Sequence, residues 1–313
     1  MWFFSLYEYV TIGGVSTLNS VIYRGPKKWI ILAPALIILV AMTIYPIFNV
    51  LIVSFQDWNL LKSPEPSGLI GFDNYTRAFQ DPDFWNSVGV TLIFTIMSVS
   101  LSIIIAIAIA LQLYPKGIYR TILKACLIFP YAISPALKGY TWRFMLNPHY
   151  GIIDKILGTL IPSLQDVVLL GTKSGALFWL AYTEIWGWAP FIALVFIGAL
   201  DMIHPDVFAA AKIDGVNKYQ MLRFVKIPLI LPVLLMVTLL KTIFSVKVFD
   251  QILTLTNGGP GQSTEAINFF IYKNGFKFFE MGYASAQSVL LILFMIVFAG
   301  VYIKTVMKGD SNA

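Results

Sequence analysis

The sequence predicts an all-α integral membrane protein with six transmembrane helices. Hydrophobic residues make up 58% of the 313 residues and charged residues only 12%, whereas soluble domains carry about 25% charged residues. Charged residues are largely absent from several long windows of the sequence. A hydrocarbon core about 30 Å thick is crossed by roughly 20 apolar helical residues, and these windows are long enough to do so.

Five windows satisfy this length plainly, and they cover residues 29–54, 88–114, 176–200, 229–249 and 284–306. A sixth window, 122–146, contains three basic residues and is interrupted by Pro130, Pro135 and Gly139. Such breakers are tolerated in a bilayer only where protein or a watery cavity satisfies the freed backbone groups. We therefore expect a kinked span beside a pathway, with a re-entrant segment as the alternative.

The spans are expected to form one transmembrane domain, 29–306. It is flanked by a cytoplasmic or interfacial segment, 1–28, and by a short cytoplasmic tail, 307–313. The N-terminus, the loops 114–121 and 201–228 and the C-terminus together hold twelve Lys and Arg residues, counting Lys124 at the membrane edge. The opposite loops hold six. Because basic residues are enriched on the cytoplasmic side, both termini are expected in the cytoplasm.

Residues 204–232 form the longest loop on the basic side, and their order is unlike that of an ordinary connection. Pro205 suits the first turn of a helix, three alanines then favour helix, and Asp214-Gly215 is a turn pair in which glycine can adopt a positive φ. A second short helix over 217–226 is expected to end at Pro228. The pattern predicts a helix–turn–helix elbow between the fourth and fifth spans.

This elbow resembles the coupling motif of ABC-importer permeases, in which Glu-Ala-Ala is followed by Gly and later by Ile and Leu-Pro. The matching residues are Ala210, Ala211, Gly215, Val225, Ile227 and Pro228. Ala209 stands where the family has Glu, which removes one polar contact but leaves the elbow. The coupling residues that the resemblance implies are Ala209, Ala210, Ala211, Asp214, Gly215, Val216, Ile227 and Pro228.

Residues 44–46 resemble the opening helix of this permease family, and residues 54–58, 71–75 and 81–85 resemble its first outer loop. Residues 129–135, 249–250 and 256–260 are similar to the maltose and glycerol-phosphate class of carbohydrate permeases. The resemblance implies a bacterial inner-membrane importer for a sugar or related polyol. It also implies a second homologous permease, two ATPase subunits that bind ATP and Mg²⁺, and an extracytoplasmic solute-binding protein. Membrane lipid is a further expected partner, and nucleic acid is not.

The chain itself contains no Gly-Lys dipeptide, so it cannot hold a phosphate loop of the G-x-x-x-x-G-K-[ST] type. It also lacks H-E-x-x-H and G-x-S-x-G motifs. Cys126 is the single cysteine. The sequence therefore predicts a transport subunit that is not an enzyme and holds no cofactor or metal. The other classes considered are an ion-driven transporter, disfavoured because only one span is clearly broken, and a scaffold.

Charged residues within the spans are candidates for solute contact, because a charge near the bilayer centre costs about 3 kcal/mol or more. Tryptophan rings could stack on a sugar ring while Lys and Glu bond its hydroxyl groups. The candidate pathway residues are Tyr131, Lys138, Trp142, Glu184, Trp186, Trp188, Lys241 and Ser245. Four positive charges against one negative in the spans favour an anionic or hydroxyl-rich solute.

Structural alternatives remain open for these residues. Glu184 could pair with a lysine across the bundle and only lock two helices. The tryptophans could form an interfacial belt. Arg143 and Lys247 could extend their charged ends to the headgroups.

Overall fold

The computed structural model describes residues 27–114, 117–164 and 167–310. The expected segment 1–28 lies outside the described residues except for Lys27 and Lys28, and so do residues 311–313 of the expected tail. The chain divides into two compact units, Met1–Val53 and Ser54–Ala313. The first unit consists, where it is described, of helix α2, Lys27–Val53, which is uncharged after Lys28 and contains two prolines.

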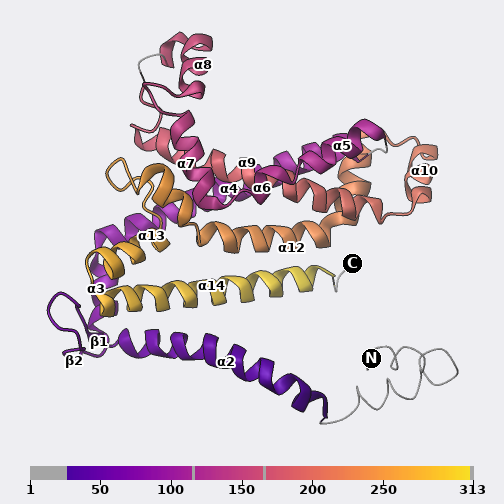
Figure 1. Ribbon diagram of the computed structural model, residues 1–313. Helices are drawn as coiled ribbons and strands as arrows, with labels where there is room; N and C mark the ends of the chain where they lie inside the picture. The colour runs from indigo at the N-terminus through magenta and orange to yellow at the C-terminus, as the bar shows by residue number, and fades with distance from the viewer. Residues whose placement is uncertain (1–26, 115–116, 165–166, 311–313) are drawn as a thin grey trace, which may run out of the picture. The chain divides into compact units, whose positions relative to one another are not determined.

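The second unit is helical apart from one two-stranded hairpin (Figure 1). Its strands pair antiparallel, with Gln56 opposite Leu69. Its elements within the described ranges are β1 Gln56–Asp57, β2 Gly68–Leu69, α3 Asp73–Gln80, α4 Pro82–Leu113, α5 Ile118–Cys126, α6 Phe129–Ala132, α7 Pro135–Met145, α8 Ile152–Leu160, α9 Lys173–Asp201, α10 Pro205–Ile213, α11 Lys218–Gln220, α12 Ile227–Val246, α13 Ile267–Tyr272 and α14 Met281–Asp310, with a 3₁₀ turn at Pro162–Leu164 and π-helical turns at Met221–Lys226, Ile252–Thr256 and Lys273–Lys277.

Five helical stretches among the described residues are long and apolar enough to cross a membrane. They contain α2, α4, α9, α12 and α14, and the bent pair of α5–α6 with α7 passes the same test as a sixth. The protein is therefore a multi-pass, mostly helical membrane protein, as the composition predicts.

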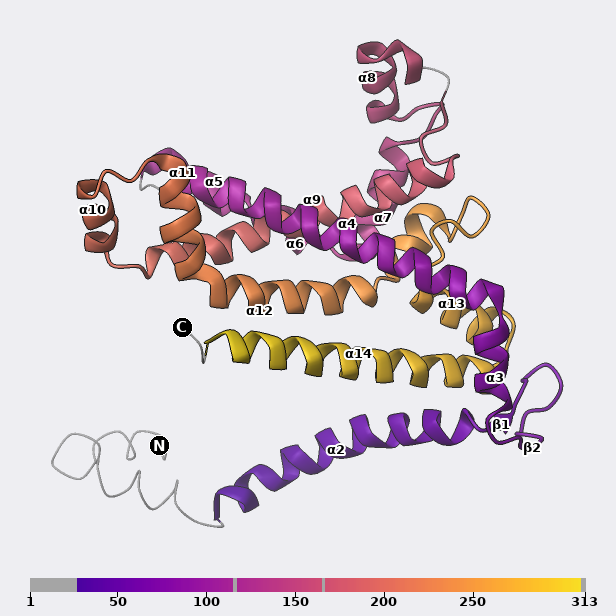
Figure 2. The same cartoon turned by 180° about the vertical axis from the view of Figure 1, so that it is seen from behind.

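Helices α4, α9 and α12 form the centre of the second unit (Figure 1, Figure 2). Small buried residues at the contacts include Ala106 and Ala110 on α4 and Ala193 on α9. Small side chains allow helix backbones in a membrane to approach closely, which strengthens the van der Waals contact between them. This contact matters because the hydrophobic effect does not drive helices together inside a bilayer. Helices α9 and α12 also carry Glu184 and Lys241, which are discussed below.

The predicted break in the third apolar window is present. Helices α5 and α6 together make an angle of 94° with α7. Ile133 has extended backbone angles, φ −73° and ψ 131°, and Ser134, which precedes Pro135, begins α7 by accepting a hydrogen bond from the backbone N–H of Leu137. A residue before proline is disfavoured in helical conformation, so the chain turns here.

The first helix of the elbow and its glycine turn are present as expected. Helix α10 ends at Asp214–Gly215, where Gly215 has φ +75°. The N–H of Val216 bonds the carbonyl of Ala211, and the N–H of Gly215 bonds that of Lys212. This pattern is a Schellman motif, which places glycine in the left-handed region.

The expectation that Pro228 ends a separate helix was wrong. A single helical stretch runs from Lys218 to Val246, and Pro228 lies in its interior, in the first turn of α12. The preceding π-helical turn gives the physical reason, because the N–H of Ile227 bonds the carbonyl of Leu222, five residues back. The hydrogen-bond register therefore changes immediately before Pro228, which has no N–H to donate.

Candidate translocation and coupling sites

A buried ion cluster joins three helices at the centre of the second unit. The Lys241 ammonium on α12 donates a hydrogen bond of 2.6 Å to the Glu184 carboxylate on α9. The two side chains are 0% and 7% exposed. Lys138 on α7 is also buried and acts electrostatically on the same carboxylate. With all three groups ionised, the cluster carries one net positive charge.

Gly187 makes room for the second lysine. A Cβ atom on Gly187 would lie 2.6 Å from the Lys138 Nζ. The ammonium therefore rests against the backbone of α9, three residues after Glu184. Residues three apart share a helix face, so one face of α9 presents a carboxylate and, next to it, a gap that admits a lysine. The Glu-x-x-Gly spacing was visible in the sequence, but it pointed to no partner.

Aromatic rings surround one side of this cluster. The Lys241 Nζ lies 4.8 Å from the centroid of the Trp188 ring. Tyr131 packs edge-on against Trp188 at 5.1 Å and stacks on Phe191 at 4.1 Å. Trp188 and Phe191 are half-buried and Tyr131 is exposed. Flat apolar faces thus lie beside buried hydrogen-bonding groups, and this combination suits a sugar ring with its hydroxyl groups.

The remaining candidates divide between two other places. Trp142, one turn after Lys138 on α7, is buried and packs edge-on against Trp186 at 5.7 Å. Ser245 faces α4, where its hydroxyl oxygen lies 3.4 Å from that of Ser98. Ser98, Gly187 and Phe191 were not predicted as candidates, because small residues and one more aromatic residue in an apolar span carry no individual signal.

The structure bears on two of the open alternatives. Glu184 does pair with a lysine across the bundle, so it holds α9 and α12 together whatever else it does. Arg143 and Lys247 are exposed, which fits charged ends that extend to the headgroups.

The elbow presents small side chains on its surface. Ala209, Ala210 and Asp214 are exposed, whereas Ala211 faces the bundle and is 8% exposed. Gly215 has nothing within 4 Å of the position where a Cβ would be, among the described residues. Val216 and Ile227 are half-buried, and Pro228 is exposed. This surface would let another backbone approach closely.

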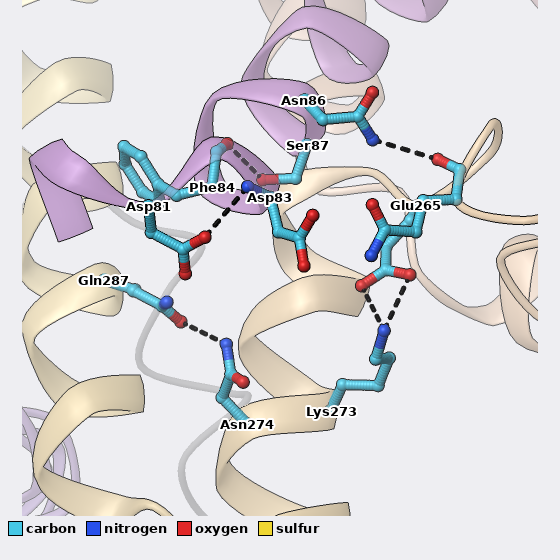
Figure 3. Close-up of polar contacts among 10 residues, drawn as sticks. Asp81, Asp83, Phe84, Asn86, Ser87, Glu265, Lys273, Asn274 and Gln287 are labelled. Carbon is cyan, nitrogen blue, oxygen red and sulfur yellow. Dashed lines mark hydrogen bonds and ion pairs between the residues drawn. The ribbon is translucent and has the colours of Figure 1, made fainter. Parts of the chain in front are cut away.

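A second polar network lies where α4 begins and connects it to the segment before α14 (Figure 3). The buried Glu265 carboxylate accepts two hydrogen bonds from Lys273, at 2.7 and 2.8 Å. The Asn274 amide donates to Gln287 at 3.1 Å, and Asn86 donates to a backbone carbonyl of the segment 257–265. These contacts stabilise the loops at the end of the unit opposite α10.

Within the described residues, no group of three or more His, Cys, Asp or Glu side chains is placed to hold a metal ion.

Comparison with known proteins identifies the family. The family model for the inner membrane component of binding-protein-dependent transport systems matches residues 98–305. A trehalose/maltose transport system permease protein of Thermococcus litoralis is 32% identical over 283 residues, which cover 90% of this chain and 94% of the relative. A sulfoquinovosyl glycerol transport system permease protein of Agrobacterium fabrum is 27% identical, with 90% of each chain covered.

Solved structures share the fold. A chain of a bacterial ABC transporter involved in the import of the acidic polysaccharide alginate superposes with a TM-score of 0.79 at 20% identity, covering 93% of this chain and 98% of that chain. A chain of a bacterial alginate transporter in complex with an alginate-pentasaccharide-bound periplasmic protein gives a TM-score of 0.76 at 20% identity, covering 90% and 94%. The predicted resemblance is confirmed, and the chain belongs to the family of inner membrane components of binding-protein-dependent transport systems.

Proposed function

We propose that this chain is one permease subunit of an ATP-driven importer that carries a sugar or sugar-like glycoside across the cytoplasmic membrane. It contributes six spans, with the broken pair α5–α6 and α7 as the third, and both termini lie in the cytoplasm. A second homologous permease, two ATPase subunits that bind ATP and Mg²⁺ and a solute-binding protein complete the complex. The similarity to a trehalose/maltose permease over 90% of the chain supports the solute class.

The exposed elbow is the observation that carries the coupling role. Ala209, Ala210 and Gly215 are small and exposed, next to the exposed Ile213, and nothing among the described residues lies within 4 Å of the position of a Gly215 Cβ. The motif lies in a chain without a phosphate loop. In this proposal α10 docks on an ATPase subunit, and closure of the two ATPase subunits moves α10. Such a shift drives the spans only if the elbow makes different contacts in the two states.

Co-purification from mildly solubilised membranes tests the assembly. The tagged chain is expected to bring down a phosphate-loop ATPase and a second multi-span protein. Gly215→Trp is expected to lose the ATPase, whereas the matched control Gly215→Asn retains it, because Asn tolerates a positive φ and adds little bulk. A stable chain that purifies alone would contradict the proposal and would favour an ion-driven transporter.

Uptake of radiolabelled maltose and trehalose tests the solute class and the aromatic cluster. Trp188→Leu removes the flat face beside Lys241, and we expect it to lower uptake roughly tenfold, since one stacked aromatic group contributes on the order of 1 kcal/mol or more. Trp188→Phe keeps a ring and is expected to retain most of the activity. Equal uptake by both variants would exclude stacking at this position.

A further inference from the structure

Three side chains from three separate segments meet where the elbow joins the spans. Lys226, the last residue of the π-helical turn before α12, places its Nζ 5.4 Å from the centroid of the Tyr114 ring and 5.8 Å from that of Phe208. The two rings meet edge-on at 6.1 Å. Tyr114 directly follows α4, and Phe208 lies within α10. All three side chains are half-buried.

The position of Phe208 gives α10 two distinct faces. Phe208 and the buried Ala211 are three residues apart, so they share one face of the helix, and that face packs toward the bundle. Ala209, Ala210 and Ile213 are exposed, and Ile213 is 86% exposed. A partner that contacts the exposed residues would therefore press on a helix whose opposite face holds the ring that touches Tyr114 and Lys226.

We propose that Lys226, Tyr114 and Phe208 form a link that transmits displacement of α10 to α4 and α12. The inference rests on the proposed function, and the three residues act as positioning residues for coupling. A cation is attracted to an aromatic face by the ring quadrupole, and partial desolvation strengthens this attraction. Because the attraction needs no fixed donor–acceptor angle, the link persists while the helices tilt.

The two helices that receive the displacement lead to the ion cluster. Lys226 precedes Lys241 by fifteen residues in one continuous helical stretch, a distance of about 22 Å along the axis. Helix α4 packs against α9, which carries Glu184. Lys226 and Lys241 lie on one helical stretch that also contains Pro228 and Pro232, so the proposed link runs from the elbow through that stretch and through α4 to the candidate translocation cluster.

The test measures ATP hydrolysis and the uptake of radiolabelled maltose and trehalose in proteoliposomes that contain the complete complex. Lys226→Met removes the charge and keeps an unbranched stem. We expect the variant complex to assemble and to hydrolyse ATP, while the amount of sugar imported per ATP falls roughly fivefold to tenfold. Phe208→Leu is expected to do the same. Lys226→Arg keeps a cation over the rings and is expected to restore the ratio to within about twofold.

Arg223 offers a matched control. Its guanidinium lies 5.9 Å from the ring of the adjacent residue Phe224, on the same helical turn, so this cation–ring contact joins no two segments. Arg223→Met should leave the import ratio unchanged. An unchanged ratio in both Lys226→Met and Phe208→Leu, or an equal loss in Arg223→Met, would overturn the link. Loss of the ATPase from the Lys226→Met complex would also overturn it, because Lys226 would then be a docking contact. Absence of ATP-driven uptake by the unaltered complex would instead contradict the proposed function.

Discussion

Replacement of Glu184 by glutamine perturbs the buried cluster most directly, since it leaves Lys138 and Lys241 buried close to each other without a carboxylate. Removing one partner of a buried ion pair costs about 3–5 kcal/mol, because the other charge stays buried and uncompensated. Lys241→Met leaves the carboxylate with Lys138 nearby, so we expect a smaller loss of about 1–3 kcal/mol. Glu184→Gln is expected to be the less stable of the two variants because one carboxylate lies close to two lysines.

The measurement is thermal unfolding in detergent, followed by tryptophan fluorescence. At about 2–4 °C of midpoint shift per kcal/mol, Glu184→Gln is expected to unfold roughly 6–20 °C below the unaltered chain. The double variant Glu184→Gln/Lys241→Met should recover part of that loss, because only Lys138 then remains charged.

A matched control is the ion pair between Arg77 and Glu280, which has nearly the same length, 2.7 Å, but side chains that are 53% and 28% exposed. Exposed pairs contribute about 0–1 kcal/mol, so Glu280→Gln should change the midpoint by no more than about 4 °C. The reasoning is refuted if Glu184→Gln unfolds at the same temperature as Glu280→Gln, or if Lys241→Met is the less stable of the two single variants.

Two further predictions concern packing and the loop network. Gly139→Ala would bring a Cβ into the Thr254 side chain and should lower stability by about 1–3 kcal/mol. The control Gly198→Ala has nothing within 4 Å of the added atom and should be neutral or slightly stabilising. Equal unfolding midpoints for the two variants would contradict the close approach of Thr254 to Gly139. Lys273→Met leaves the buried Glu265 carboxylate without its partner and should speed proteolytic cleavage within 257–265. Lys273→Arg keeps a cation there and should keep this segment protected from cleavage. Unchanged cleavage in Lys273→Met would contradict a stabilising role of the Lys273–Glu265 pair.

Local patterns predicted most of the helical stretches, and the differences have physical causes. The second apolar window begins at residue 88, whereas α4 begins at Pro82. Residues 82–87 include Asp83, Asn86 and Ser87, which lower the hydropathy of this segment. However, Asp81 accepts a hydrogen bond from the N–H of Asp83 and Pro82 occupies the first turn. These are ordinary helix-start features. The π-helical turn before Pro228 could not be predicted, because it depends on how Met221–Lys226 packs against α10 and α12.

The candidate pathway residues were found because charge and tryptophan stand out in an apolar span. The sequence could not choose among their roles. It left Glu184 as either a solute contact or a helix lock, and the 2.6 Å contact shows that Glu184 pairs with Lys241 across the bundle. Lys226 was not predicted as a candidate, since a lysine at the end of a span is expected to extend toward the headgroups. In the structure its ammonium lies over two aromatic rings.

The sequence by itself determined the apolar spans, the break at Pro135 and the glycine turn of the elbow. Each of these follows from residues adjacent in the chain, through hydropathy, the restriction before proline and the freedom of glycine at positive φ. Only the tertiary structure decided that Lys241 pairs with Glu184, 57 residues away, and that Gly187 admits Lys138. Those pairings depend on the rotation and register with which α7, α9 and α12 pack. That register is set by the summed van der Waals contacts of many small side chains, which no local pattern in the sequence encodes.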